Sequence, residues 1–163
     1  MRAIRLEVKA FADAPRDIVY RTLTDISNRH KFVSAVERVD LVSKGPVGIG
    51  TRYVEGRTVF GRGVAIEFTV GDYDPPGSFV LSAETAGVGF EVSCTLAYTG
   101  HETGITLELV GTPESIGGRF AAFGLSVLAN RLGAELSTEL DEIAREAERR
   151  YAVRRPASGS DGS

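Results

Sequence analysis

Tryptophan is absent from the chain, cysteine and methionine occur once each, and histidine occurs twice. The single cysteine, Cys94, excludes an internal disulfide framework and fits a reducing compartment. With one cysteine, the two histidines, His30 and His101, offer no spacing typical of metal ligands. We therefore expect no metal and no other cofactor, and we interpret Cys94 as a small buried hydrophobe.

Charge of one sign and long apolar runs are also lacking. The 19 basic and 22 acidic residues are interspersed, which gives a formal charge of −3 and no basic stripe for nucleic acid. No apolar run approaches the about 20 residues of a membrane span, and the N-terminus has no apolar segment typical of a signal peptide. We expect a cytoplasmic protein without a nucleic-acid partner or a membrane span, and leave a homodimer open.

The 163 residues suit a single domain, which we place at residues 1–151. From Ala152 the composition shifts to Arg, Pro, Ser and Gly, which predicts a disordered tail over residues 152–163. Most basic residues are Arg, while Ala and Gly are abundant, a composition typical of a GC-rich bacterial genome.

Residues 113–151 predict one long helix around which the rest of the chain is organised. Its apolar residues recur every three or four positions: Leu125, Leu128, Leu132, Leu136, Leu140, Ile143 and Ala147. At about 1.5 Å per residue, the proline-free part of this stretch from Arg119 onward would span about 45 Å, longer than a small domain is wide. Its leucine stripe needs a broad apolar cover.

The residues before this helix alternate as strands do. The pattern predicts a strand from Ile4 to Ala10, two short helices between Asp13 and about Val33, and six strands in a meander ending at Thr112. The fold class is therefore α+β, with a curved antiparallel sheet covering the long C-terminal helix.

Hairpin counting indicates which residues face that helix. If Val59 pairs with Val64 across a short loop, Arg57 lies opposite Ile66. The core-facing residues of the earlier strand are then Tyr53, Glu55, Arg57 and Val59. The same counting pairs Thr85 with Phe90 and Tyr98 with Ile105. If Ser43 lies opposite Thr51, Glu37 lies across from Arg57 and could pair with it.

Charged groups on a core face are costly unless they are paired or face a water-filled cavity. One hypothesis is a pocket between sheet and helix with Glu55 and Arg57 as its polar contacts. An alternative is an ion pair at the rim of the sheet that reaches solvent. A one-residue bulge would also turn both side chains outward.

The pocket hypothesis gives a set of candidate ligand-binding residues, with no catalytic residue assigned. Tyr98 offers a hydroxyl to a ligand or fills space, and Phe120, Phe123 and Val127 line the pocket or belong to ordinary core. The whole candidate set is Tyr53, Glu55, Arg57, Phe68, Tyr98, Phe120, Phe123 and Val127.

Several segments resemble the polyketide cyclase/dehydrase group of the START-like (SRPBCC, Bet v 1-like) superfamily. The residues that carry the resemblance are Ala14, Pro15, Asp17, Val19, Leu23 and Asp25, then Gly50, Thr51, Arg52, Glu55, Gly61 and Arg62, and then Tyr73, Asp74, Pro75 and Pro76. The match covers about residues 3–150. Where members often carry Trp after the first helix, this chain has only His30 and Phe32.

The resemblance implies a helix-grip fold, in which a seven-stranded antiparallel sheet wraps the C-terminal helix and leaves an apolar cavity. It also implies ligand binding, with a few members acting as aromatase/cyclases. Three hypotheses follow: a binding module for a polyketide-, lipid- or isoprenoid-like molecule, a cyclase or dehydratase, and a protein-interaction module with a filled cavity. In the enzyme hypothesis Glu55 is the general base, Arg57 stabilises an enolate, and Tyr53 lies on the same face.

Overall fold

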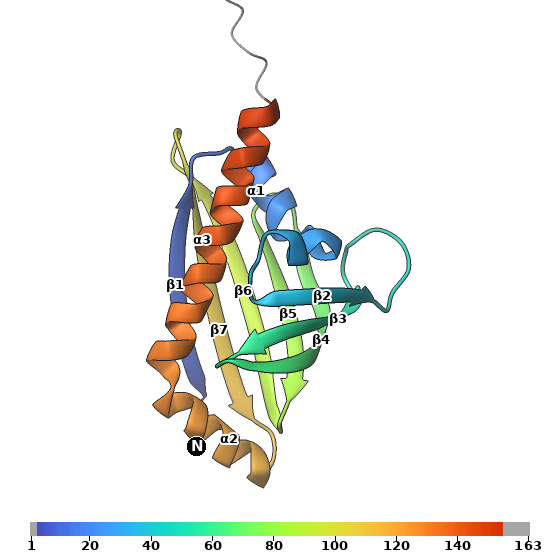
Figure 1. The fold of residues 1–163 in the computed structure, drawn as a ribbon, viewed down its shortest axis with the longest axis vertical. Coiled ribbons are helices and arrows are strands. Elements are labelled where there is room, and N and C mark those ends of the chain that lie inside the picture. The colour runs from blue at the N-terminus through green and yellow to red at the C-terminus, as the bar shows by residue number, and fades with distance from the viewer. Residues whose placement is uncertain (1–2, 155–163) are drawn as a thin grey trace, which may run out of the picture.

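A seven-stranded antiparallel sheet crossed by a long helix forms the part of the chain described by the computed structural model, residues 3–154 (Figure 1). The strands are β1 (Ile4–Ala12), β2 (Val36–Leu41), β3 (Arg52–Val59), β4 (Arg62–Asp74), β5 (Ser78–Thr85), β6 (Val88–Tyr98) and β7 (Thr103–Pro113). The helices are α1 (Arg16–Leu23), the 3₁₀ helix η1 (Ile26–Lys31), α2 (Ile116–Val127) and α3 (Ala129–Arg154).

The strand order is β1-β7-β6-β5-β4-β3-β2, so the predicted six-strand meander is present and β1 pairs with its last strand. Figure 1 shows β2, β3 and β4 turned strongly away from the direction of β1 and β7, so the sheet curves around α3. The predicted α+β, helix-grip architecture is confirmed. No helix within residues 3–154 is long and apolar enough to cross a membrane.

Three hairpins have tighter turns than the sequence predicts. Phe60 and Gly61 form a two-residue turn with φ of 51° and 77°, so β3 pairs Val59 with Arg62 rather than with Val64. Positive φ at both positions is the geometry of a type I′ turn, in which phenylalanine is unusual. The predicted pairing was therefore wrong by two residues. Because side chains alternate with a period of two, every residue still faces the predicted side.

The same correction applies at two other hairpins. Thr85 pairs with Val88, across a turn with φ of 53° at Ala86, and Tyr98 pairs with Thr103. Both strand pairs keep their predicted apolar faces, because the register again changes by two residues.

The predicted pairing of Glu37 with Arg57 is wrong. The register between β2 and β3 shifts between Val36 and Arg38, and Val36 lies opposite Arg57. Such a bulge gives one strand an extra residue and turns its side chain away from the regular alternation. Glu37 is exposed at this irregularity.

The predicted single long helix is divided into α2 and α3. Leu128 ends α2 with φ −97° and ψ 12°, and its N–H donates to the carbonyls of Gly124 and Leu125. One straight helix would extend far past the end of the sheet. The break lets α2 fold across that end, where Ala122 packs with Ile4 and Val88 in a small second core.

The main core lies between the sheet and the middle of α3. Leu140, Ile143 and Ala147 are buried there against residues of every strand, of α1 and of η1. The predicted disordered tail lies outside the described residues from 155 onward, and residues 152–154 belong to α3.

Candidate functional site

The sheet and the helices line a cavity of about 330 Å³. Apolar side chains from β3 to β7 form most of its wall, and α2 and α3 close the helical side. The charged residues in the wall are Arg29, Glu55, Arg57, Glu135 and Glu139. A mostly apolar cavity with a few grouped polar side chains is the usual form of a small-molecule site.

Four of these residues form one hydrogen-bonded network, which we call the inner cluster: Arg29, Glu55, Arg57 and Glu139. The two carboxylate oxygens of Glu55 accept from Nη1 of Arg29 and Nη1 of Arg57, both at 3.1 Å. Arg57 also donates to Oε2 of Glu139 on α3, and Arg29 donates to the carbonyl of Leu23. Two positive and two negative groups make the cluster neutral, which offsets much of the cost of burying them.

The inner cluster is buried rather than at the rim of the sheet. The side chain of Glu55 is 0% exposed, and those of Arg29 and Arg57 are 6% and 14% exposed. The alternatives of a solvent-reaching pair and of an outward-turning bulge are therefore wrong. Glu55 and Arg57 face the core, as the hairpin counting predicts.

Opposing effects act on the two arginines. Burial alone lowers the pKa of Arg29, but its interactions with Tyr53, Glu55 and Glu139 outweigh burial and raise that pKa. Burial also opposes the charge of Arg57, and the carboxylates of Glu139 and Glu55 raise its pKa. Burial is the main reason why the pKa of the Tyr53 hydroxyl is raised. The cavity therefore has two permanently charged guanidinium groups beside a protonated phenol.

Three buried polar atoms in this region have no hydrogen-bond partner among residues 3–154: Nε of Arg29, Nε of Arg57 and the hydroxyl oxygen of Tyr53. The Tyr53 hydroxyl lies close enough to Arg29 for the guanidinium to favour its ionised form, without a hydrogen bond of ordinary geometry. A buried donor left unpaired costs about 1–3 kcal/mol.

The end of the cavity far from the inner cluster is closed by fewer and more exposed contacts. The backbone N–H of Phe60 donates to the carboxylate of Glu135 at 3.2 and 3.4 Å, and the guanidinium of Arg131 lies 5.5 Å from the Phe60 ring centroid. At Gly118, an added Cβ would overlap the carbonyl oxygen of Gly87, so α2 touches the β5–β6 turn backbone to backbone. We call residues 116–136, which cover this end, the outer segment.

The structure brings three of the candidate ligand-binding residues to the cavity wall and places a fourth behind it. Glu55, Arg57 and Phe68 line the cavity. Tyr53 is fully buried behind them, with its ring stacked on Phe68 at 5.4 Å between centroids. Cys94 also lies in the wall, and burial raises its pKa to about 12, which agrees with a small buried hydrophobe.

The remaining four candidates lie outside the cavity wall, and their predicted placement is corrected. Tyr98 is 51% exposed and its hydroxyl donates to the carbonyl of Gly100, because the tight hairpin puts it beside the β6–β7 turn. Phe120, Phe123 and Val127 are 76%, 60% and 70% exposed. The helix break rotates α2 so that Ala121 and Leu125 face the cavity instead.

Sequence reasoning missed Arg29 and Glu139, although both carried a signal. Glu139 lies on the same helical stripe as Leu136 and Ile143, so it interrupts an apolar face. Arg29 lies three residues after buried Ile26, which puts both on one side of a 3₁₀ helix. Glu55, Arg57 and Glu139 thus share one feature, a charged side chain on an otherwise apolar face of a strand or helix.

The wall offers charge and hydrogen bonds rather than metal ligands. Within residues 3–154, no group of three or more His, Cys, Asp or Glu side chains could hold a metal ion. The inner cluster can orient a polar group of a ligand and stabilise negative charge on it, since both guanidinium groups stay protonated.

The sequence model of one protein family, described as "Polyketide cyclase / dehydrase and lipid transport", matches most of the chain, residues 3–148. The chain therefore belongs to this family. No curated protein is similar enough in sequence to count as a relative.

Solved structures share the fold at low identity. The aromatase/cyclase ZhuI from Streptomyces sp. R1128 superposes with a TM-score of 0.77 at 20% identity, covering 97% of this chain and 99% of that one. A norcoclaurine synthase point mutant from Thalictrum flavum superposes with a TM-score of 0.70 at 10% identity, covering 91% of this chain and 96% of that one. The di-domain aromatase/cyclase StfQ of the steffimycin pathway gives 0.72 at 15% identity, covering 92% of this chain and 52% of that one.

Proposed function

We propose that this member of the polyketide cyclase / dehydrase and lipid transport family binds an apolar or aromatic small molecule in the cavity between the sheet and α3. The observation that carries the proposal is an apolar cavity of about 330 Å³ with a buried, neutral charge cluster in its wall. Side chains do not fill this volume, so the hypothesis of an interaction module with a filled cavity is not retained.

The size and polarity of the cavity describe the ligand. Its volume lies near the lower end of the about 300–1,000 Å³ found for small-molecule sites. Arg29 and Arg57 in the cavity wall are hydrogen-bond donors, so the ligand would carry an acceptor such as a carbonyl, phenolate or carboxylate oxygen. The expected ligand is a compact ring system or short chain with an oxygen at one end.

A second candidate is a cyclase or dehydratase, because aromatase/cyclases are among the solved structures with this fold. The geometry argues against Glu55 as the general base, since both of its oxygens already accept hydrogen bonds from guanidinium groups. Glu139 is better placed, because it lines the cavity and Arg57 engages it through Oε2. Arg57 keeps the role of stabilising a developing enolate.

A thermal-shift screen with aromatic ketones, fatty acids and isoprenoids tests the binding proposal. A ligand at 100 times its dissociation constant should add about 2.7 kcal/mol to the free energy of unfolding. Arg57→Ala should weaken binding of a hit by about 1–3 kcal/mol, as expected for a charge-assisted hydrogen bond. No shift across the three classes would contradict the proposal.

A matched control lies on the same strand. Arg52 also belongs to β3, but its side chain is 53% exposed and pairs with Glu67 on the outer face. Arg52→Ala should change affinity by less than about 0.5 kcal/mol. For the enzymatic candidate, Glu139→Gln should abolish turnover of a bound polyketone while leaving its affinity within a few fold.

A further inference from the structure

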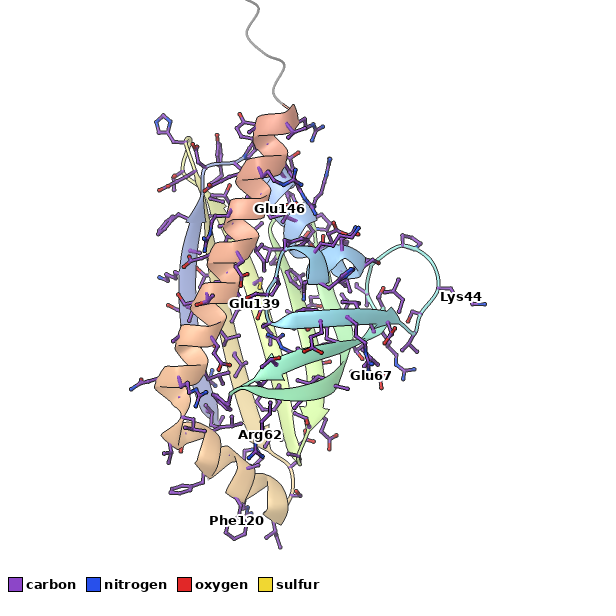
Figure 2. The ribbon with its side chains drawn as sticks, in the orientation of Figure 1. Lys44, Arg62, Glu67, Phe120, Glu139 and Glu146 are labelled. Atoms are coloured by element: carbon purple, nitrogen blue, oxygen red, sulfur yellow. The ribbon has the colours of Figure 1, made fainter. Side chains whose placement is uncertain are left out.

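The outward face of α2 is an apolar stripe with no cover among the described residues. Steps of four, three and four residues place its side chains on one side of the helix. The members are Ile116, Phe120, Phe123 and Val127, with exposed fractions of 75%, 76%, 60% and 70%. We call these four residues the α2 stripe. Figure 2 shows Phe120 at one end of the elongated molecule, pointing away from the sheet.

The opposite face of α2 is apolar as well. Gly118 and Ala122 are buried, and Ala121 and Leu125 line the cavity. A surface helix normally has a polar face opposite its buried one, so apolar residues on two opposite faces of α2 are unusual. The α2 stripe is therefore a surface whose cover comes from outside residues 3–154.

The stripe is too small for a stable homodimer on its own. Four side chains of this size, exposed at these fractions, present on the order of 500 Å². A stable interface needs about 800 Å² from each partner, with close shape complementarity. A bilayer needs neither, because its headgroup boundary adapts to a protruding helix.

Local charge favours an anionic surface. The sequence has a formal charge of −3, yet it contains no Asp or Glu between Ser115 and Ala134. Arg119, in α2, and Arg62 are exposed and form no ion pair within residues 3–154. Figure 2 shows Arg62 toward the same end of the molecule as Phe120.

The two acids that flank this stretch, Glu114 and Glu135, have different surroundings. Glu135 accepts from the backbone N–H of Phe60. The carboxylate of Glu114 lies against Gly89, where an added Cβ would overlap its Oε1. The end of the molecule that carries the α2 stripe thus presents two arginines without an ion pair among residues 3–154, Arg62 and Arg119, together with the exposed carboxylates of Glu84 and Glu114 beside the β5–β6 turn.

We propose that the α2 stripe docks on a bilayer that contains anionic lipid. The four side chains enter the boundary between headgroups and acyl chains, and Arg62 and Arg119 contact lipid phosphates. The helix lies in the interface. Leu125 and Leu132, on the cavity side of the outer segment, then lie close to the bilayer. Ligand exchange with the bilayer would rest on the proposed ligand binding, whereas the docking itself does not.

The absence of tryptophan gives a direct test. Phe123→Trp introduces a single fluorophore into the stripe. Phe11→Trp is the matched control, since Phe11 is also 60% exposed but lies near the other end of β1 from Ile4, which packs with α2. With vesicles of phosphatidylcholine and phosphatidylglycerol, the emission of the Phe123→Trp variant should shift to the blue and be quenched by brominated lipid. The emission of the control should not change. No change in either variant would overturn the proposal.

Vesicle flotation of the otherwise unchanged chain gives a second test. Phe120→Ser should weaken binding about tenfold or more, from the lost burial of one aromatic side chain. Phe11→Ser should leave binding unchanged. Arg119→Glu should weaken binding because it replaces an attractive charge by a repulsive one. Added salt should weaken binding because it screens the attraction between the arginines and the anionic lipid. Equal binding to pure phosphatidylcholine would overturn the anionic preference.

Analytical ultracentrifugation without lipid tests whether the α2 stripe binds a second copy of the chain instead of a bilayer. A homodimer that Phe120→Ser dissociates, together with no binding to either vesicle, would overturn the proposal in favour of a dimer interface. Phe11, Phe120 and Phe123 are all mostly exposed, so their substitution should leave folding intact, as circular dichroism would show.

Discussion

The two ends of the cavity are held in different ways. At the inner end, the buried residues of α3 all lie between Glu139 and Ala147. The helix from Glu139 onward also contacts the N-terminal third of the chain, where Ser34 donates hydrogen bonds to Glu142 at 2.9 and 3.0 Å and Asp25 pairs with Arg150 at 2.7 Å (Figure 2 labels Glu139 and Glu146 along this part). None of the first eight residues of α3, 129–136, is buried.

This difference indicates which end of the cavity can open. Segments with few buried apolar contacts open locally at a free-energy cost far below that of global unfolding. The outer segment has few such contacts, whereas the inner cluster is fixed by four charged groups and the main core. A ligand would therefore enter past α2 and be oriented at the inner cluster.

The largest effect should come from breaking the inner end. Glu55→Ala leaves two buried guanidinium groups without their shared carboxylate, and should lower the free energy of unfolding by about 3–5 kcal/mol. Urea denaturation measures the change. Glu67→Ala, which removes an exposed partner of Arg52, is the control and should cost less than about 1 kcal/mol. Similar costs for the two variants would contradict the distinction between the ends.

Two leucines of α3 sharpen the comparison with the same chemical change. Leu140 is 0% exposed in the main core, so Leu140→Ala should cost about 2–5 kcal/mol. Leu132 faces the existing cavity from the outer segment, and Leu132→Ala should cost less than about 2 kcal/mol. If the two denaturation midpoints fell equally, the outer segment would be as firmly packed as the core.

Two glycines of α2 distinguish its contact side from its free side. Gly118→Ala would force α2 away from the carbonyl of Gly87 and should cost about 1–3 kcal/mol, with faster amide exchange in α2. Gly124 is exposed with open space at its Cβ position, so Gly124→Ala should stabilise the helix by up to about 1 kcal/mol. Destabilisation by both substitutions would show that α2 is packed on its outward side too.

The smallest effect concerns pH at the anchored end of α3. Hydrogen bonds from Arg149, opposed by burial and aided by Arg150, lower the pKa of Glu146 from 4.5 to about 2. A depressed carboxylate pKa contributes stability above its unfolded value and loses it as pH falls toward the folded value. Wild-type stability should therefore fall between about pH 5 and pH 2 more than that of Glu146→Gln. Parallel acid-unfolding curves would contradict this.

Much of the sheet was predictable because strand patterns are local. The alternation over β4 and β6 identified their core faces, and the two-residue errors in hairpin register left those faces unchanged. The turn at Phe60 escaped prediction because its positive φ is unusual for that residue. Glu135 and Arg131, which hold it, come from a helix far along the chain.

By itself, the sequence determined the order of the elements, the faces of the strands and the presence of Glu55 and Arg57 on the core side, because each depends on a period of two or of 3.6 along one segment. Only the tertiary structure decided the partners of those charges. Arg29 lies 26 residues from Glu55, and Glu139 lies 82 residues from Arg57. The same holds for the break at Leu128, which turned the α2 stripe outward: it follows from where the sheet ends, and local periodicity carries no information about that distance.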